Sequence, residues 1–204
     1  MSAKGQGRPK RILIIAGSDS SGGAGIQADI KTVTMLGGYA MTAITAVTAQ
    51  NTKGVSAVEL LTPDMVAAQM DACMTDIGVD AVKIGMLGSA DIAEVVADRL
   101  EDLPVPIVFD PVMVATSGSV LADEATVGAF EWLMELATLT TPNLPELAAL
   151  GGAGAMAERG IAWLAKGGDA EGPTVEDILH RPGRAPVMWQ APRIITRHTH
   201  GTGC

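Results

Sequence analysis

Aromatic residues and cysteines are scarce in this sequence. Phe, Trp and Tyr together make up 3% of its 204 residues, and it contains two cysteines, Cys73 and Cys204. Two cysteines cannot form a disulfide framework, which favours a reducing compartment and hence a cytoplasmic protein. Scarce aromatics combined with 24 glycines predict a core of small and aliphatic side chains and many tight turns, as in α/β proteins.

Long apolar runs and an excess of positive charge are also lacking. No stretch is long enough to cross a membrane, and residues 12–16 are too short an apolar run for the core of a signal peptide. The net charge of -9 makes nucleic acid and anionic membranes unexpected partners. With 48% hydrophobic residues, we expect one folded domain over residues 11–204, preceded by a flexible basic tail over residues 1–10.

The first structured segment is predicted to be a strand, a glycine-rich loop and a helix. Residues 11–16 are an apolar run typical of a strand buried on both faces, and residues 26–36 carry apolar side chains at helical spacing. The loop between them fits neither nucleotide motif, because no acid follows about 20 positions on and no lysine follows Gly22. We expect it to bind something other than nucleotide phosphates, or simply to turn the chain.

Polar side chains end or interrupt the next two predicted strands. Gln50 ends the strand predicted over residues 43–50, at the edge where open α/β sheets bind ligands. Its amide can donate and accept at once, which suits a nitrogen heterocycle. Lys83 lies inside the apolar run 80–87, where it could pair with a carboxylate near the site or reach solvent from an edge.

Acids and an amide follow at later strand ends. Asp110 follows a predicted strand and is placed to position a metal ion, or only to form an Asx turn before proline. Asn143 and Glu146 lie about one turn apart at a helix start and could reach one ligand or a hydrated Mg²⁺. The same two residues also fit a capping box, and both interpretations can hold together.

The last third of the chain is predicted to close the sheet. Lys166 lies near the end of a strand predicted over residues 161–168. Residues 171–186 are expected to be turn-rich and exposed, followed by antiparallel strands over residues 187–190 and 192–198.

His198 and His200 alternate along the last of these predicted strands and could share a face. The chain has one further histidine, His180. A metal site would need more ligands than this pair, so we do not expect one there.

The chain ends in a glycine-rich turn and a cysteine. The backbone N–H groups of Gly201, Thr202 and Gly203 could point at one anion. A positive field at such a turn would lower the pKa of the Cys204 thiol and favour the thiolate. We interpret this turn as the place where a transferring phosphoryl group is stabilised, with Cys204 as the base. A plain glycine turn with a buried cysteine is the alternative.

Repeated alternation of strands and helices predicts an α/β fold, a three-layer α/β/α sandwich around a mainly parallel sheet. Seven segments then match one family in order: residues 15–29, 44–52, 83–86, 110–113, 141–146, 166–168 and 199–204. On these segments the chain resembles the bacterial hydroxymethylpyrimidine/phosphomethylpyrimidine kinases of thiamine biosynthesis, in the ribokinase superfamily, from about residue 11 onward.

The resemblance implies two successive phosphorylations by MgATP, the first on 4-amino-5-hydroxymethyl-2-methylpyrimidine and the second on its monophosphate. It implies that Gln50 and Asp29 hydrogen-bond the pyrimidine. It also implies a pocket lined by Gly17, Ala24, Met86 and Val112. Asn143, Glu146 and Lys166 would serve ATP, with Asp110 and Glu146 at Mg²⁺. Gly201, Thr202 and Gly203 would form the anion hole and Cys204 would be the base. A homodimer is usual for relatives.

Three features depart from the family pattern. Relatives continue past the cysteine into a helix, residues 150–160 are shorter than the family connector, and Asp169 replaces a common histidine. We therefore expect missing C-terminal helices and a lost helix near 150–160. A sheet without its last covering helix would expose a large apolar face, so further residues are expected after Cys204. A pyridoxal-type kinase and a non-catalytic pyrimidine-binding protein remain the alternatives.

Overall fold

The computed structural model describes residues 7–114, 121–196 and 198–202. Over these residues, nine strands form one sheet. The strands are β1 (Arg11–Asp19), β2 (Tyr39–Asn51), β3 (Gly54–Leu60), β4 (Ala81–Ile84), β5 (Ile107–Phe109), β6 (Leu139–Thr140), β7 (Trp163–Ala165), β8 (Thr174–His180) and β9 (Val187–Pro192).

Helices connect the strands, and most of them begin at a side-chain cap. The helices are α1 (Gly25–Met35), α2 (Pro63–Ala72), α3 (Ala90–Leu100), α4 (Glu124–Leu136), α5 (Leu144–Ala149) and α6 (Gly152–Glu158), with a π-helical turn η1 (Cys73–Ile77) extending α2. Thr62, Ser89, Asp123 and Asn143 each accept a hydrogen bond from a first-turn N–H of the helix that follows. These caps satisfy donors that have no partner within the helix.

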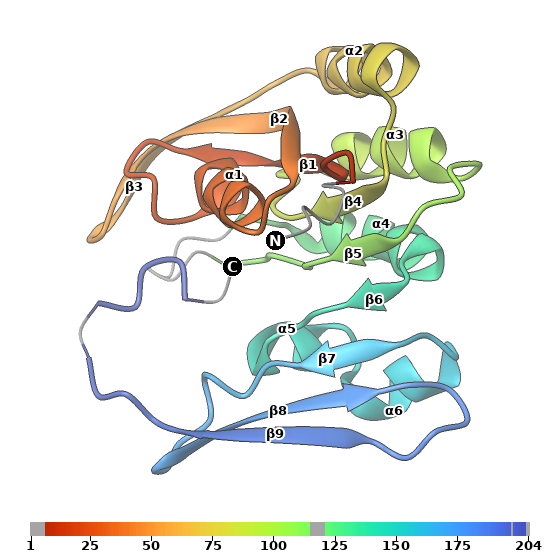
Figure 1. The fold of residues 1–204 in the computed structure, drawn as a ribbon. Helices are drawn as coiled ribbons and strands as arrows, with labels where there is room; N and C mark the ends of the chain where they lie inside the picture. The colour runs from red at the N-terminus through yellow and green to blue at the C-terminus, as the bar shows by residue number, and fades with distance from the viewer. Residues whose placement is uncertain (1–6, 115–120, 197, 203–204) are drawn as a thin grey trace, which may run out of the picture.

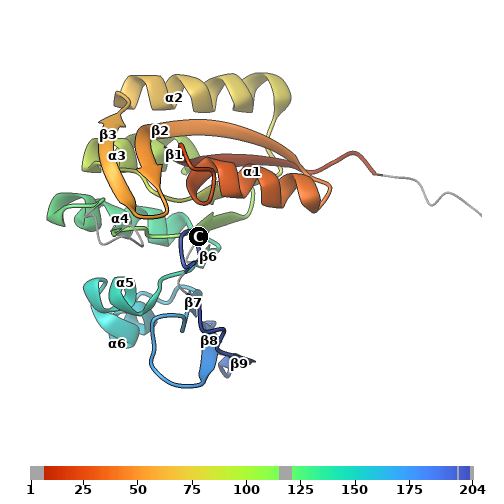
Figure 2. The ribbon, with the colours of Figure 1, turned by 90° about the vertical axis from the view of Figure 1, so that its left-hand side faces the viewer.

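The helices lie on both faces of the sheet, which confirms the predicted three-layer α/β/α sandwich (Figure 1). Figure 2 shows α1 on one face and the other helices on the opposite side. None of the helices in the described part of the chain is both long and apolar enough to cross a membrane.

The sheet is parallel in its middle and antiparallel at its edges. Its strand order is β3-β2-β1-β4-β5-β6-β7-β8-β9. The neighbours from β2 to β7 pair in parallel, whereas β3, β8 and β9 are added antiparallel. Parallel strands bring their carboxyl ends to one edge of the sheet, and in such sheets that edge carries the ligand site.

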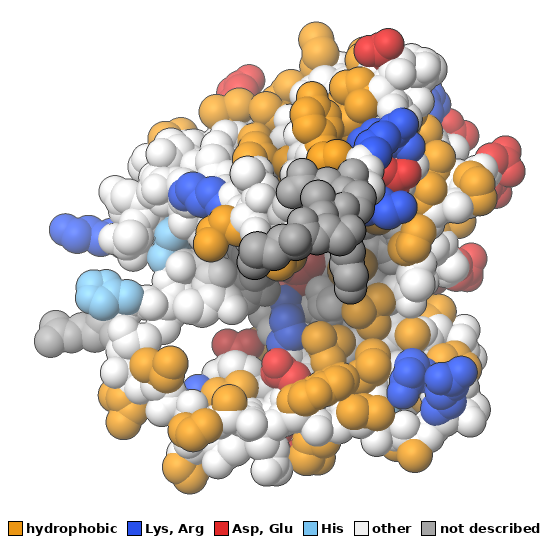
Figure 3. Space-filling model, in the orientation of Figure 1, with side chains coloured by type: hydrophobic (Ala, Val, Ile, Leu, Met, Phe, Trp, Pro, Cys, Tyr) orange, Lys and Arg blue, Asp and Glu red, His pale blue; other side chains and the backbone are white. Residues whose placement is uncertain are grey.

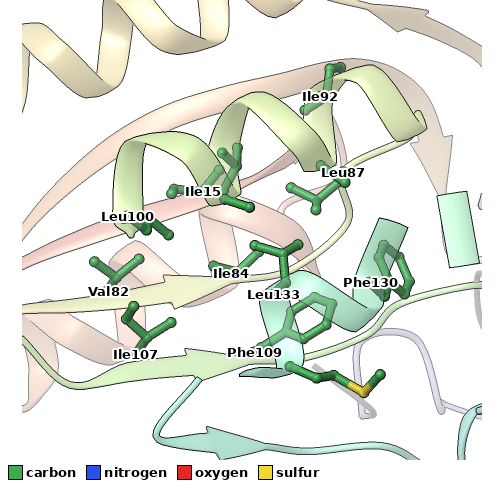
Figure 4. Close-up of a cluster of buried hydrophobic side chains, with 14 of the residues drawn as sticks. Ile15, Val82, Ile84, Leu87, Ile92, Leu100, Ile107, Phe109, Phe130 and Leu133 are labelled. Carbon is green, nitrogen blue, oxygen red and sulfur yellow. The ribbon is translucent and has the colours of Figure 1, made fainter. Parts of the chain in front are cut away.

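The core divides according to the two faces of β1. Leu13 and Ile15 point into the larger cluster, between the sheet and helices α2, α3 and α4 (Figure 4). Ile14 and Ala16 point into the smaller cluster, against Ile26 of α1. Because both faces of β1 are buried, the strand shows a continuous apolar run rather than alternation.

Two sequence predictions are wrong near the sheet edges. Residues 174–180, expected to be turn-rich, form β8, and the second closing strand does not form because β9 ends at Pro192 and residues 193–196 have no regular structure. The hairpin strand β3 was not predicted. These edge strands bury few side chains, so they lack the strong apolar pattern of central strands.

The segment around residues 150–160 does contain a helix, α6. The expected loss of a helix relative to the family connector stays a prediction. On the opposite face, apolar side chains of α1 pack against β1 and β2. Residues in β4 and directly after β5 and β7 line a cavity.

Candidate active site

A cavity of about 1210 Å³ lies at the carboxyl ends of the parallel strands. Figure 3 shows a hollow in the middle of this face, with acidic and basic side chains inside it. Of the residues proposed from the sequence, those that line the cavity are Gly17, Ala24, Gln50, Met86, Asp110, Val112, Asn143, Glu146, Lys166 and Thr202. Asp29 and Gly201 are not in its lining, and Gly203 and Cys204 lie outside the described residues.

The glycine-rich loop is wrapped around a carboxylate of its own chain. Asp19, the last residue of β1, is 2% exposed. It accepts hydrogen bonds from the N–H groups of Ser21, Gly23 and Ala24 at 2.8, 3.0 and 2.8 Å. These amides are therefore occupied by the carboxylate of Asp19, and the prediction that the loop binds something other than nucleotide phosphates stays a prediction.

The pKa of Asp19 reflects two opposing causes. Burial by itself raises it, but hydrogen bonds from His200, Ser21 and Ala24 outweigh burial and hold the pKa at about 2. Asp19 is thus an anion at neutral pH and remains one while buried.

Gly17 gives Met86 room beside the loop. A Cβ on Gly17 would lie 2.6 Å from Cε of Met86, closer than side-chain atoms approach. Gln50 also lines the cavity, and its Oε1 accepts a hydrogen bond from Thr48 Oγ1 at 3.1 Å. The cavity lining thus includes apolar side chains and one primary amide near the loop.

Lys83 pairs with a carboxylate, as one of the two sequence interpretations predicted. Its Nζ lies 2.8 Å from Asp29 Oδ2, and the two side chains are 20% and 14% exposed. Lys83 lines the cavity, and Asp29 is not among the lining residues. Direct contact between Asp29 and a ligand stays a prediction, and Lys83 is the member of the pair that faces the cavity.

A second charged cluster follows β5 and β7. Phe109 anchors the end of β5 by an edge-to-face contact with Phe130 of α4, with ring centroids 5.1 Å apart. Asp110 comes next and is 3% exposed. Its Oδ1 accepts hydrogen bonds from Lys166 Nζ at 2.7 Å and Thr141 Oγ1 at 3.2 Å.

Glu146 belongs to the same cluster and forms the predicted capping box. The Asn143 N–H donates to Glu146 Oε2 and the Glu146 N–H donates to Asn143 Oδ1, both at 2.8 Å. Burial raises the pKa of Glu146 to about 7, with Asp110 adding to the shift and Asn143, Lys166 and the Met113 backbone opposing it. For this carboxyl, burial therefore outweighs the hydrogen bonds and the nearby Lys166, whereas for Asp19 the hydrogen bonds outweigh burial.

The cluster fits a Mg²⁺–nucleotide complex better than a metal cage. In the described part of the chain, no group of three or more His, Cys, Asp and Glu side chains could hold a metal by itself. Mg²⁺ typically takes one or two carboxylates together with substrate phosphates and water. Asp110 and Glu146 would offer two such oxygen ligands, and a nearby cation would favour the charged form of Glu146.

The terminal turn packs directly against the glycine-rich loop. Gly201 has a φ of 75°, and a Cβ there would lie 2.0 Å from the backbone oxygen of Gly23. The Thr202 N–H donates to Thr199 O at 3.1 Å, so in this structure it closes the turn. Two members of the predicted site lie outside the described residues. They are Gly203, predicted to belong to the anion hole, and Cys204, predicted to be the base.

Two residues of the site were not assigned to it from the sequence. His200 was considered only as a metal ligand, yet it contacts Asp19. Arg193 was placed in a closing strand, yet its guanidinium donates to the carbonyls of Gly168, Ala170 and Gly172, and so holds the turn after Lys166. Neither contact leaves a periodic pattern in the sequence, because each joins irregular segments.

Comparison with known proteins agrees with this geometry. A family model described as "Phosphomethylpyrimidine kinase" matches residues 19–204. The hydroxymethylpyrimidine/phosphomethylpyrimidine kinase of Rhizobium meliloti is 46% identical over 207 residues, covering 94% of this chain and 77% of that protein.

Solved structures give the same result at the level of the fold. A phosphomethylpyrimidine kinase from Clostridium difficile superposes with a TM-score of 0.77 and 39% identity, covering 88% of this chain and 84% of that one. A pyridoxal kinase from Staphylococcus aureus, in complex with AMP-PCP and pyridoxal, gives 0.85 and 31%, covering 97% and 77%. On the family match and these identities, the chain belongs to the phosphomethylpyrimidine kinase family.

Proposed function

We propose that the protein transfers a phosphoryl group from ATP to the hydroxymethyl group of 4-amino-5-hydroxymethyl-2-methylpyrimidine, and then phosphorylates the monophosphate to the diphosphate. The observation that carries this proposal is one cavity with two chemically different halves. One half has apolar walls with the Gln50 amide and Lys83, and the other holds Asp110, Glu146 and Lys166. Its volume of about 1210 Å³ exceeds the roughly 300–1,000 Å³ of a typical ligand pocket, which suits two substrates side by side.

The apolar half suits the pyrimidine. Gly17, Ala24, Met86 and Val112 form walls that a flat ring can contact. Gln50 offers both a donor and an acceptor to the adjacent ring nitrogen and amino group. Binding there would aim the hydroxymethyl group toward the terminal turn.

The charged half suits the phosphates of ATP. Bound with the nucleotide, Mg²⁺ would neutralise phosphate charge, and Asp110 and Glu146 are the residues that would hold it. Lys166 would then approach the phosphates from the end of β7. In phosphoryl transfer, such positioning and charge neutralisation provide most of the rate enhancement.

Cys204 would accept the proton of the attacking hydroxyl, and the amides of Gly201, Thr202 and Gly203 would stabilise the phosphoryl group. The sequence of the turn supports both roles. We also propose that the protein works in the cytoplasm and that it forms a homodimer. Light scattering of the purified protein would test the homodimer.

A pyridoxal-type kinase is the second candidate. The pyridoxal kinase neighbour shares the fold closely and was solved with pyridoxal and AMP-PCP bound. Both rings are flat nitrogen heterocycles that carry a hydroxymethyl group, so shape alone does not separate them.

Steady-state kinetics with three acceptors tests the proposal. ADP release in the presence of MgATP should be fastest with the hydroxymethylpyrimidine, measurable with its monophosphate and weak with pyridoxal. A higher kcat/KM for pyridoxal would establish the second candidate. Calorimetric binding of the pyrimidine without any turnover would instead indicate a binding protein.

A further inference from the structure

A hydrogen bond joins the glycine-rich loop to the terminal turn. His200 Nε2 lies 2.8 Å from Asp19 Oδ2, and the two side chains are 13% and 3% exposed. The same nitrogen lies 3.1 Å from Ser21 Oγ. Residues 181 positions apart in the chain are thus held together inside the cavity wall.

His200 completes the surroundings of a carboxylate that is otherwise bound only by its own loop. The remaining hydrogen bonds of Asp19 come from Ser21, Gly23 and Ala24, all within five residues. Burying a carboxylate is costly unless hydrogen bonds satisfy its oxygens. His200 supplies a further hydrogen bond to Asp19, and this contact fixes the position of the turn relative to the loop.

The backbones of the two segments are also in close contact. A Cβ on Gly23 would lie 2.5 Å from Cδ2 of His200, and a Cβ on Gly201 would lie 2.0 Å from the oxygen of Gly23. Glycine at both positions lets ring and backbone meet without an intervening side chain. The spacing between loop and turn is therefore set by close packing as well as by the hydrogen bond between His200 and Asp19.

We propose that Asp19 and His200 are a positioning pair that holds the terminal turn against the glycine-rich loop. The loop borders the pyrimidine half of the cavity, and the turn carries the groups proposed to act on the phosphoryl group. The pair would keep the acceptor hydroxyl and the anion hole at a fixed separation. This inference rests on the proposed function and adds to it a coupling between acceptor binding and catalysis.

A positioning role makes a specific kinetic prediction. Misplacement of reacting groups by about 1 Å costs on the order of 10²-fold in rate, while binding of each substrate is less affected. We expect His200→Leu to lower kcat by about 10–100-fold, with each KM changed by no more than about threefold. Asp19→Asn also disturbs the hydrogen bonds from the loop amides, so it should lower kcat at least as much. The double variant should be no worse than Asp19→Asn alone, because the contact with His200 is already lost in that variant.

Two comparisons separate positioning from other roles. Gln can place its amide nitrogen near the position of Nε2 but cannot act as a base, so His200→Gln should recover most of the lost kcat. If His200 acted as a base, His200→Gln would be as damaged as His200→Leu, and the proposal would be overturned. Asp80→Asn is the matched control: Asp80 pairs with Arg11 at 2.8 Å, at the amino ends of β1 and β4. It should lower the unfolding temperature and leave kcat unchanged.

A measurement without substrate keeps this test independent of the proposed function. Hydrogen exchange of the Gly23 and Ala24 amides should accelerate at least about tenfold in His200→Leu, as local opening becomes easier. It should stay slow in Asp80→Asn. Slow exchange in His200→Leu, or additive losses of kcat in the double variant, would overturn the positioning pair. A wild-type protein that does not phosphorylate the pyrimidine would refute the proposed function, while exchange would still report on the pair.

Discussion

Two buried carboxylates in the cavity wall respond in opposite ways to similar burial. Asp19 is 2% exposed and Glu146 is 5% exposed. The pKa of Asp19 is lowered to about 2, whereas that of Glu146 is raised to about 7. Burial favours the neutral form of both, so the difference must lie in their partners.

The two halves of the site differ in how completely their carboxylates are hydrogen-bonded. Asp19 is hydrogen-bonded by His200 and by three loop amides. Glu146 shares its surroundings with a second acid, Asp110, whose ion pair already engages Lys166. The pyrimidine half is therefore organised in the absence of ligand, while the charged half gains stability when a cation arrives. Each prediction below tests this contrast.

The largest effect is expected at the terminal turn, which joins the two halves. Cys204→Ala should lower kcat by about 10²–10⁴-fold, the usual contribution of a general base. Pyrimidine binding, measured by calorimetry, should be unchanged, because the pyrimidine half is already organised. An unchanged kcat would remove Cys204 from the mechanism, and lost binding would show that the turn shapes the pyrimidine half.

Exchanging the two cavity lysines for methionine compares the halves directly. Lys166 and Lys83 are 21% and 20% exposed and both pair with a carboxylate. Lys166→Met leaves two acids with less positive charge nearby, so we expect it to lower the free energy of unfolding by about 3 kcal/mol and to raise the KM for MgATP. Lys83→Met should destabilise less, since its partner Asp29 is more exposed, and should raise the pyrimidine KM instead.

Urea unfolding and steady-state kinetics on both variants supply the test. If both variants raise the same KM, the division of the cavity into a pyrimidine half and a charged half is wrong. Equal losses of stability in Lys166→Met and Lys83→Met would contradict the expected difference between the two ion pairs.

The raised pKa of Glu146 predicts how stability changes with pH. Its ordinary value of 4.5 applies to the unfolded chain and about 7 to the folded protein. Between these values the folded state keeps a proton that the unfolded state has released, so stability falls as pH rises. The loss should reach about 3 kcal/mol near pH 7. Glu146→Gln should lack this loss. The test is the free energy of unfolding of the wild type and of the variant, measured across pH 4.5–7 in metal-free buffer. The difference between the two isolates the contribution of Glu146.

Mg²⁺ with a nucleotide provides the matching control. A cation near Glu146 favours its charged form, so the pH-dependent loss should shrink in the wild type and stay absent in Glu146→Gln. If the free energy of unfolding of the wild type did not change with pH in the absence of metal, the pKa of Glu146 would not be raised. The proposed difference between Glu146 and Asp19 would then be wrong.

The sequence was informative where function depends on local order. Asp110 directly follows an apolar strand, and Asn143 and Glu146 have the spacing of a capping box, so their places could be predicted from a few neighbouring residues. The carboxylate partner of Lys83 was also foreseen as one option, because a lysine within an apolar run needs a counter-charge. In each case the governing interaction is short in sequence or imposed by burial.

Prediction failed where an element depends on distant partners. β8 carries Glu176 and Asp177 in its middle and buries little, so its pairing with β7 decides its conformation. The contact of His200 with Asp19 spans nearly the whole chain. Nothing in the spacing near either residue indicates the other, and only the folded sheet brings them together.

The smallest effect is expected at Gln50, in the half that is already organised. Gln50→Ala removes about one hydrogen bond to the ring, worth about 1 kcal/mol, and should raise the pyrimidine KM by about 5–10-fold. The KM for MgATP and kcat should not change. Thr48→Val keeps the amide but removes the hydroxyl that orients it, so its increase should be smaller, about two- to threefold. An unaltered pyrimidine KM in Gln50→Ala would show that the ring binds elsewhere. If the KM for MgATP rose as much as the pyrimidine KM, the two halves of the cavity could not be perturbed separately.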